Sequence, residues 1–153
     1  MKTVLFLCTG NYYRSRYAEE LFNHGAVRIG LTWRAQSRGL AIERGLNNIG
    51  PLSQYALEGL RDRGLVAHGG DRFPEQCTVI DLEGASHIVA LYEPEHRPLL
   101  RERFSGWEKR VEYWQVADVE VVSPKIALGV IDRQIDALFA RAAVSATSSL
   151  GLL

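Results

Sequence analysis

The stretch TVLFLCTGNYYRS, from Thr3 to Ser15 near the start of a chain of 153 residues, decides the fold. Its first residues are mostly apolar and lead directly to Cys8. A short apolar run of this kind is typical of a strand that is buried in a parallel sheet. Gly10 and Asn11 then predict a tight loop, and Ser15 predicts the start of a helix. The stretch therefore predicts a strand, a loop and a helix, with Cys8 at the carboxyl end of the strand.

The rest of the chain repeats this alternation. Strand-like apolar segments occur at residues 2–8, 31–37, 86–92 and 110–116. Helical patterns lie between and after them, from Ser15, over residues 55–63, 78–83 and 94–104, and from Pro124. Such alternation indicates an α/β fold with a four-stranded parallel sheet and helices on both faces. We expect a single domain of residues 1–144 and a frayed tail of residues 145–153.

The composition argues against several classes of partner. The 18 Lys and Arg residues balance the 18 Asp and Glu residues, and no basic run stands out, so neither nucleic acid nor a membrane surface is expected. No apolar segment has the length of a membrane span, which predicts a cytoplasmic location. The two cysteines, Cys8 and Cys77, are too few for a disulfide framework, and no Cys/His spacing is typical of zinc. We expect neither a metal nor a cofactor.

The loop after the first predicted strand has the residues of an anion site. Its backbone N–H groups and the start of the next helix would point at one oxyanion. Gly10 and Asn11 tolerate the positive φ angles that such a loop requires. Arg14 can bind two phosphate oxygens at once with its planar guanidinium. The same positive groups favour the thiolate of Cys8, which predicts a nucleophile directly beneath a bound phosphate.

This loop has two other interpretations. Cys8 could be a buried structural cysteine that lies near Arg14 by chance. The order of strand, Cys8, five residues, Arg14, Ser15 and helix favours the catalytic interpretation. The phosphate loop of ATP-binding proteins is excluded because it requires Gly-Lys-Ser/Thr, whereas this chain has Tyr13-Arg14-Ser15.

Several segments together resemble one known family. VLFLCTGNYYRSRYAEELF, from Val4 to Phe22, resembles the opening of the low-molecular-weight protein-tyrosine phosphatases, a family that includes thioredoxin-type arsenate reductases. SRGL, SHIVALYEPEH and VADV resemble later segments of the same family. The resemblance implies a flavodoxin-like fold and the hydrolysis of phosphate esters through a phosphocysteine, without a metal.

The resemblance also implies roles for individual residues. Cys8 would be the nucleophile and Arg14 would bind the transferring phosphoryl group. The expected phosphate-binding residues are Thr9, Gly10, Asn11, Tyr12, Tyr13, Arg14 and Ser15.

The resemblance further implies a buried network that supports the loop. Asn11, Ser15, Ser37 and His68 would form this network, with Ser15 donating to the Cys8 thiolate. His68 has an alternative interpretation as a surface histidine, because the surrounding residues differ from the family.

A carboxylic acid should protonate the leaving group and later deprotonate the attacking water. Asp118 is the candidate because its loop follows the fourth predicted strand, and Glu120 is the reserve. A solvated loop aspartate is the alternative interpretation of Asp118. The family has proline and aromatic residues after this aspartate, whereas this chain has Val119-Glu120-Val121. Tyr12 is a candidate for the missing aromatic wall, although it could equally be a core or surface residue.

We therefore predict a cysteine-dependent phosphomonoester hydrolase acting on phosphorylated protein or small aryl phosphates, with phosphate and sulfate as competitive ligands. One alternative is an arsenate reductase that uses an external thiol or Cys77. It is disfavoured because Tyr13 stands where many family members have a second cysteine. Another alternative is a phosphate-binding module with little turnover.

Overall fold

The structure, a computed structural model, describes the backbone of residues 1–151 and the side chains of residues 1–144. A four-stranded parallel sheet in the order β2-β1-β3-β4 lies at its centre. The strands are β1 (Thr3–Cys8), β2 (Arg34–Gly39), β3 (His87–Ala90) and β4 (Glu112–Tyr113). The helices are α1 (Arg14–Ile29), α2 (Gln54–Asp62), α3 (Val79–Gly84), α4 (Glu93–Arg103) and α5 (Pro124–Gly151), with short turns η1 (Ile42–Gly45) and η2 (Trp107–Lys109). The predicted α/β fold is confirmed.

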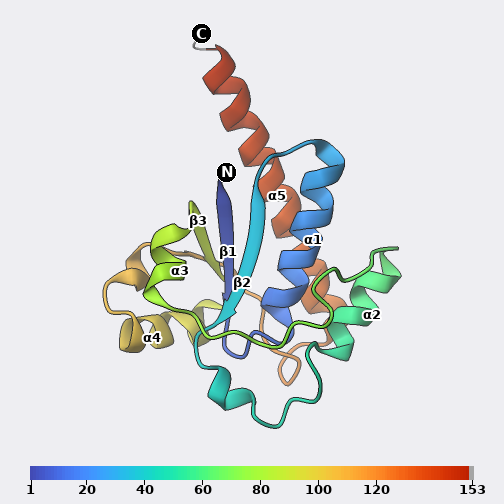
Figure 1. The fold of residues 1–153 in the computed structure, drawn as a ribbon, viewed down its shortest axis with the longest axis vertical. Helices are drawn as coiled ribbons and strands as arrows, with labels where there is room; N and C mark the ends of the chain where they lie inside the picture. The colour runs from blue at the N-terminus through green and yellow to red at the C-terminus, as the bar shows by residue number, and fades with distance from the viewer. Residues whose placement is uncertain (152–153) are drawn as a thin grey trace.

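Helices cover both faces of the sheet. In Figure 1, α1, α2 and α5 lie on one side of the strands, whereas α3 and α4 lie on the other. The four strands are parallel and run downward in that view, so their carboxyl ends lie together at the bottom of the sheet. This edge is where ligands bind in doubly wound sheets. Helix α5 extends to Gly151, past the predicted limit of the domain at residue 144. That limit and the predicted fraying of residues 145–153 stay predictions.

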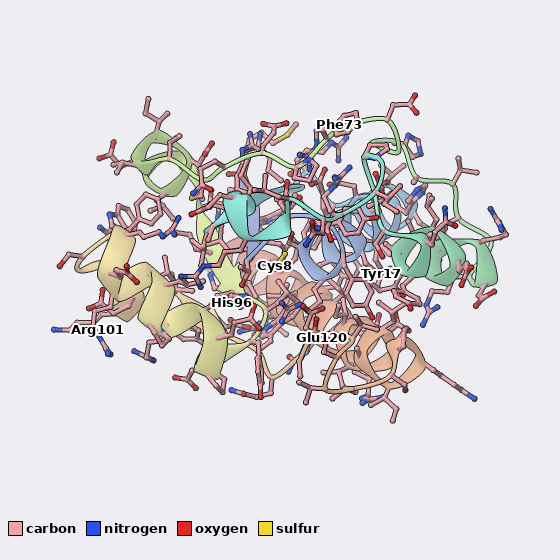
Figure 2. All side chains as sticks on the ribbon, turned by 90° about the horizontal axis from the view of Figure 1, so that it is seen from below. Cys8, Tyr17, Phe73, His96, Arg101 and Glu120 are labelled. Carbon is pink, nitrogen blue, oxygen red and sulfur yellow. The ribbon has the colours of Figure 1, made fainter. Side chains whose placement is uncertain are left out.

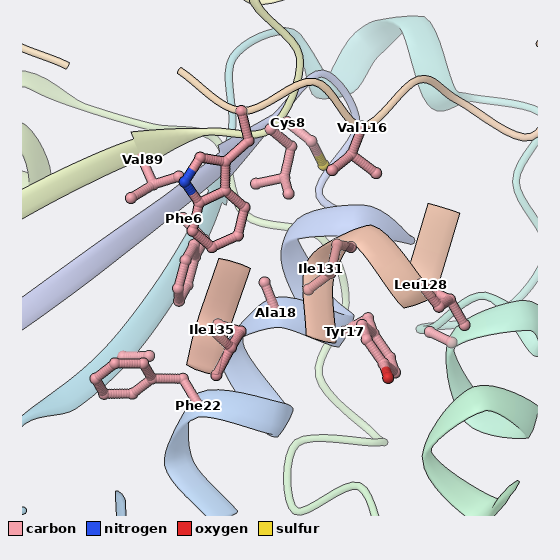
Figure 3. Packing of buried hydrophobic residues seen from close by; sticks show 14 of the residues in the cluster. Phe6, Cys8, Tyr17, Ala18, Phe22, Val89, Val116, Leu128, Ile131 and Ile135 are labelled. Atoms are coloured by element: carbon pink, nitrogen blue, oxygen red, sulfur yellow. The ribbon is translucent and has the colours of Figure 1, made fainter. Parts of the chain in front are cut away.

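The central strand β1 is buried on both faces, which explains its unbroken apolar run. Val4, Phe6 and Cys8 belong to the cluster shared with α1, α2 and α5, whereas Leu5 and Leu7 belong to the cluster under α3 and α4. Alternate residues of a strand point to opposite faces, so a doubly covered strand must be apolar throughout. Figure 3 shows the first cluster, where Phe6 and Cys8 lie close to side chains of α1 and α5.

Local sequence signals begin and end most helices as expected. The Ser53 side chain accepts a hydrogen bond from the Tyr55 N–H at the start of α2, and Gly64 adopts φ 73° just beyond its end. Thr78 and Asp81 form a reciprocal capping box at α3. The prediction for Ser15 as the start of α1 is wrong by one residue and in its reason. The helix begins at Arg14 without a side-chain cap, and the Ser15 hydroxyl faces Cys8 instead.

The end of β2 lies directly against the loop that follows β1. Gly39 pairs with Cys8, and a side-chain carbon at Gly39 would come within 2.9 Å of the Thr9 carbonyl oxygen and 3.1 Å of Asn11 Cβ. Only glycine allows so close an approach between two backbones.

Within the described chain, no helix has the length and apolar character that a membrane span requires.

Candidate active site

Residues 9–13 connect β1 to α1 and form the predicted loop. The backbone N–H groups of residues 10–15 have no hydrogen-bond acceptor among the residues that the structure describes. They belong to a tight loop and to the first turn of a 16-residue helix, where the helix dipole also favours negative charge. The loop therefore has the donors that bind a phosphate-like anion.

The turn of the loop is made by Asn11 and not by Gly10. Asn11 has φ 51°, and it is the one non-glycine residue with a positive φ angle in the described chain. Gly10 has no positive φ angle, so that part of the prediction is wrong. Asparagine tolerates this conformation better than most residues, but tertiary contacts must still hold it.

Those contacts come from the fully buried Asn11 side chain. Its Nδ2 donates to Ser15 Oγ at 3.0 Å and to Ser37 Oγ at 2.9 Å. Its Oδ1 accepts from Arg72 Nη1 at 3.1 Å and from the Glu75 N–H at 3.0 Å. Every donor and acceptor of the amide is thus used, which fixes the turn of the loop.

Arg72 takes the place that was predicted for His68, and this prediction is wrong. The Arg72 guanidinium also donates to Ser37 Oγ at 3.0 Å and to Glu19 Oε1 at 3.1 Å, which pairs its charge. The His68 ring instead packs edge-on against His24, with the ring centroids 4.6 Å apart. In the sequence, the acidic residue Glu19 in α1 indicates that a basic partner is needed. The sequence does not show which arginine is that partner.

Arg16 fixes the outer side of the same loop. Its guanidinium is buried and donates to four carbonyl oxygens, at distances from 2.7 to 3.3 Å. These carbonyls belong to Asn11, Pro51, Gly69 and Arg72, so one side chain joins three segments that are far apart in the sequence. Burial, together with the nearby charge of Arg72, lowers the pKa of Arg16. Sequence reasoning missed this residue because its partners are backbone groups.

Cys8 lies on the floor of a cavity of about 310 Å³ at the carboxyl edge of the sheet. The residue is 3% exposed, and its Sγ lies 2.9 Å from Ser15 Oγ. In Figure 2, which views this edge, Cys8 lies between the α4 side, marked by His96, and the loop before α5, marked by Glu120. The predicted loop residues that line the cavity with Cys8 are Thr9, Gly10, Tyr12, Tyr13 and Arg14. Asn11 and Ser15 lie behind it as support.

Arg14 brings a buried positive charge to this cavity. Its Nη1 donates to the Val116 carbonyl oxygen at 3.0 Å, and its Nη2 donates to Glu95 Oε2 at 2.9 Å. Asp118 Oδ2 lies 3.7 Å from the same Nη2. Burial alone would lower the pKa of Arg14, but the negative charges of Cys8, Glu95 and Asp118 raise it overall. The guanidinium therefore stays charged beside the sulfur.

The structure brings both predicted acids to the mouth of the cavity. Asp118 and Glu120 line the cavity together with Val119. Asp118 Oδ1 accepts the Val119 N–H at 2.8 Å, and its carbonyl oxygen accepts the N–H groups of Val121 and Val122. These bonds hold the aspartate in a compact turn without the proline that the family has there.

Aromatic side chains form part of the wall. Tyr12 donates its hydroxyl to the Ile49 carbonyl oxygen at 2.5 Å, and Tyr13 packs edge-on against Tyr55 with centroids 5.9 Å apart. All three tyrosines line the cavity. Burial, followed by the charge of Asp118, raises the pKa of Tyr13 to about 12, so its hydroxyl stays neutral. Tyr12 thus lines the cavity, and its role as a replacement wall stays a prediction.

A larger cavity of about 450 Å³ lies at the opposite, amino end of the sheet. Its lining is mostly apolar and includes Leu31, Trp33 and Leu138. It contains no cysteine, so it offers no nucleophile of that kind. In the part of the chain that the structure describes, no group of three or more His, Cys, Asp or Glu side chains is arranged to hold a metal ion. The candidate active site is therefore the cavity that Cys8 lines.

Comparison with known proteins agrees with this geometry. The family described as low molecular weight phosphotyrosine protein phosphatase matches residues 3–125, which include Cys8, Arg14 and Asp118. The chain belongs to this phosphatase family. The resemblance seen in the sequence is thereby confirmed. Among curated proteins, none matches significantly.

Several solved structures share the fold of this chain. The low molecular weight protein tyrosine phosphatase from T. tengcongensis is 24% identical, with a TM-score of 0.74 over 92% of this chain and 99% of that chain. Wzb from Vibrio vulnificus, solved with benzylphosphonate, is 17% identical, with a TM-score of 0.76 over 92% and 98%. The YwlE arginine phosphatase from Geobacillus stearothermophilus is 20% identical, with a TM-score of 0.69 over 97% and 95%. A phosphatase named for tyrosine and one named for arginine thus share this fold.

Proposed function

We propose that this phosphatase hydrolyses phosphate monoesters through a phosphocysteine on Cys8. One observation carries the proposal most directly. The Cys8 sulfur lies beneath a loop whose N–H groups from residues 10–15 are uncommitted, beside the charged guanidinium of Arg14. A thiolate held below bound phosphate is oriented for in-line attack.

In the first step, the Cys8 thiolate attacks phosphorus. The S–P bond forms as the ester P–O bond breaks, and the Asp118 carboxyl group transfers its proton to the leaving oxygen. Loop N–H groups and Arg14 stabilise the charge on the phosphoryl oxygens. The Ser15 hydroxyl, 2.9 Å from Sγ, hydrogen-bonds the sulfur in its anionic form.

In the second step, water attacks the phosphocysteine. The Asp118 carboxylate takes a proton from the water as the new O–P bond forms and the S–P bond breaks. Inorganic phosphate and the Cys8 thiolate are the products. Sulfate and phosphate would compete with substrate because both fit the same donors. No metal or cofactor enters these steps.

Aryl phosphates are the substrate class that the cavity favours. Tyr12, Tyr13 and Tyr55 give it an aromatic wall, and such rings stack on the ring of an aryl group. The structural neighbours include tyrosine phosphatases and an arginine phosphatase, so phosphorylated protein and small aryl phosphates are both candidate substrates. We expect these reactions in the cytoplasm, with neither nucleic acid nor a membrane involved.

Arsenate reduction through Cys77 receives no support from the described side chains. Cys77 is buried in the cluster under α3 and α4, whereas Cys8 belongs to the cluster on the other face of the sheet. Burial, followed by the charge of Asp81, raises the pKa of the Cys77 thiol to about 12. A reductase would therefore depend on an external thiol.

Steady-state hydrolysis of a chromogenic aryl phosphate between pH 4.5 and 8 tests the proposal. We expect Cys8→Ser to abolish turnover. Asp118→Asn should lower kcat by roughly 10²-fold for poor leaving groups and less for good ones, because a general acid matters most for a poor leaving group. Glu120→Gln is the matched control and should change kcat little.

Phosphoarginine, tested in parallel, distinguishes the two substrate classes that the neighbours represent. A higher kcat/KM for the aryl phosphate supports the proposed class, and the reverse order contradicts it. If Asp118→Asn hydrolyses both substrates at the rate of the unmodified protein, the acid is not Asp118. Phosphate binding without any turnover would instead indicate a phosphate-binding module.

A further inference from the structure

Glu95, in the first turn of α4, contacts the phosphate-binding loop, and the proposed reaction gives this carboxylate no role. Its Oε2 accepts hydrogen bonds from Arg14 Nη2, at 2.9 Å, and from the Thr9 hydroxyl. Arg14 and Thr9 are both residues of the phosphate cavity. A single carboxylate oxygen thus joins the arginine and the first loop residue after Cys8.

The contacts of Arg14 define which part of its guanidinium is left for a ligand. Nη1 and Nη2 each have one acceptor, Val116 and Glu95 respectively. The Nε–H and the second hydrogen of each Nη have no acceptor within hydrogen-bond distance among the described residues. Guanidinium groups bind phosphate oxygens in pairs through parallel N–H groups, and such donors remain here. Glu95 therefore holds the side chain without using all of its donors.

Electrostatics keeps Glu95 charged in this position. Burial alone would raise its pKa, but contacts with His96, Arg14 and Thr9, together with the charge of Arg14, hold it well below the usual range. Glu95 also lies at the N-terminus of an 11-residue helix, where the helix dipole favours a carboxylate. The guanidinium, 3% exposed, thus has a permanent counter-charge.

His96 is a buried neighbour of Glu95. It is fully buried, and its Nδ1 accepts the Tyr92 N–H at 2.9 Å, which assigns the proton to Nε2. Nε2 lies 3.1 Å from Glu95 Oε2 but is not aligned for a hydrogen bond. Burial lowers the pKa of His96, so the ring is neutral and does not compete with Arg14 for the charge of Glu95.

We propose that Glu95 is a positioning residue, which holds Arg14 and Thr9 in the geometry that binds the phosphoryl group. The alternative is that Glu95 occupies donors that phosphate needs, so that the two anions compete for Arg14. Two observations favour positioning: the Arg14 Nε–H has no acceptor among the described residues, and Glu95 lies in α4 and not in the phosphate-binding loop. The inference rests on the proposed function but concerns phosphate binding, which can be measured without turnover.

Calorimetric titration with inorganic phosphate tests it, using the full chain. Glu95→Gln keeps the size of the side chain and one oxygen acceptor but removes the charge. We expect the Kd for phosphate to rise by about tenfold, because a misplaced guanidinium loses paired hydrogen bonds. Glu93→Gln is the matched control, since Glu93 lies in the same helical turn and pairs with Arg97 outside the cavity. It should leave the Kd unchanged.

A double-mutant cycle shows whether the effect passes through Arg14. In an Arg14→Lys background, Glu95→Gln should cause little further loss, because the residue that Glu95 positions is already changed. Tighter phosphate binding in Glu95→Gln would show competition and overturn the proposal. An unchanged Kd with a lower melting temperature would show a purely structural role and overturn it too.

If Glu95→Gln folds poorly, a second variant still tests the proposal. Glu95→Asp keeps the charge but is too short to reach both Arg14 and Thr9, so positioning again predicts weaker phosphate binding, whereas competition predicts no loss. If the unmodified protein binds phosphate but hydrolyses no ester, the proposed function fails while the assignment of Glu95 is still tested.

Discussion

Arg14 and Arg16 lie two residues apart at the start of α1, and each is 3% exposed, yet their surroundings differ. Arg14 faces carboxylates and the Cys8 sulfur at the cavity, and part of its guanidinium is uncommitted. Arg16 faces four neutral carbonyl oxygens and lines no part of that cavity. Two buried arginine side chains in neighbouring positions thus have different roles. Charged partners and free donors mark the arginine that binds ligand, whereas saturated carbonyl contacts mark the one that holds the loops together.

The largest expected effect separates these two arginines. Arg14→Lys should lower kcat/KM for an aryl phosphate by roughly 10²–10³-fold, because lysine cannot bind two phosphate oxygens with parallel N–H groups. Its melting temperature should fall less than that of Arg16→Lys, because only one carbonyl oxygen, that of Val116, loses its donor while the positive charge beside Glu95 is kept. Steady-state kinetics and thermal unfolding of the same preparation check both statements.

Arg16→Lys should show the opposite pattern. A lysine ammonium cannot span the carbonyls of three segments, so buried acceptors lose their partners and the free energy of unfolding should fall by about 2–3 kcal/mol. At a temperature where the variant is folded, kcat/KM should stay within about tenfold of the unmodified protein. An Arg16→Lys variant that is stable but inactive would remove the distinction between the two arginines.

Asn11 sharpens the comparison, because it belongs to both regions. Its carbonyl accepts from Arg16, and its amide is held by Arg72, Ser15 and Ser37. Asn11→Ala should lower the free energy of unfolding by about 2–4 kcal/mol, through lost hydrogen bonds and the strain of alanine at φ 51°. Asn11→Gly loses the same bonds without the strain and should be about 1 kcal/mol more stable than Asn11→Ala. Equal stability in chemical denaturation would show that the turn is not strained.

The smallest expected effect concerns pH on the Arg14 side. The folded pKa of Glu95 is lower than its value in the unfolded chain, so its contribution to stability is present above the unfolded pKa, about 4.3. That contribution is lost as the pH falls towards the folded pKa. The difference in unfolding free energy between the unmodified protein and Glu95→Gln should therefore shrink from pH 5 to pH 3. A difference that stays constant over this range would contradict a charged Glu95 paired with Arg14.

The sequence was sufficient for the parts of the molecule that local patterns determine. The apolar run before Cys8, the loop residues and the start of α1 are adjacent in the chain, so β1, its loop and α1 could be predicted directly. Asp118 could be placed near Cys8 because the carboxyl ends of parallel strands share one edge of the sheet.

The remaining errors come from contacts between distant segments. His68 and Arg72 lie in a loop without a helical or strand period, so the sequence does not show which of them faces Asn11. The assignment of Ser15 as a helix cap failed because its hydroxyl faces Cys8. Glu95 was missed because its position in α4 marks it only as a favourable first-turn acid, and the partner that gives it a role is 81 residues away.

The most direct test of the central claim is to trap the intermediate. The protein is mixed with an aryl phosphate, quenched within one turnover and digested, and the peptide that contains Cys8 is weighed by mass spectrometry. We predict an added mass of one phosphoryl group on Cys8, which is absent from Cys8→Ser and accumulates when Asp118→Asn slows hydrolysis of the intermediate. Full turnover of the ester with no adduct on Cys8 under any of these conditions would contradict nucleophilic catalysis by this cysteine.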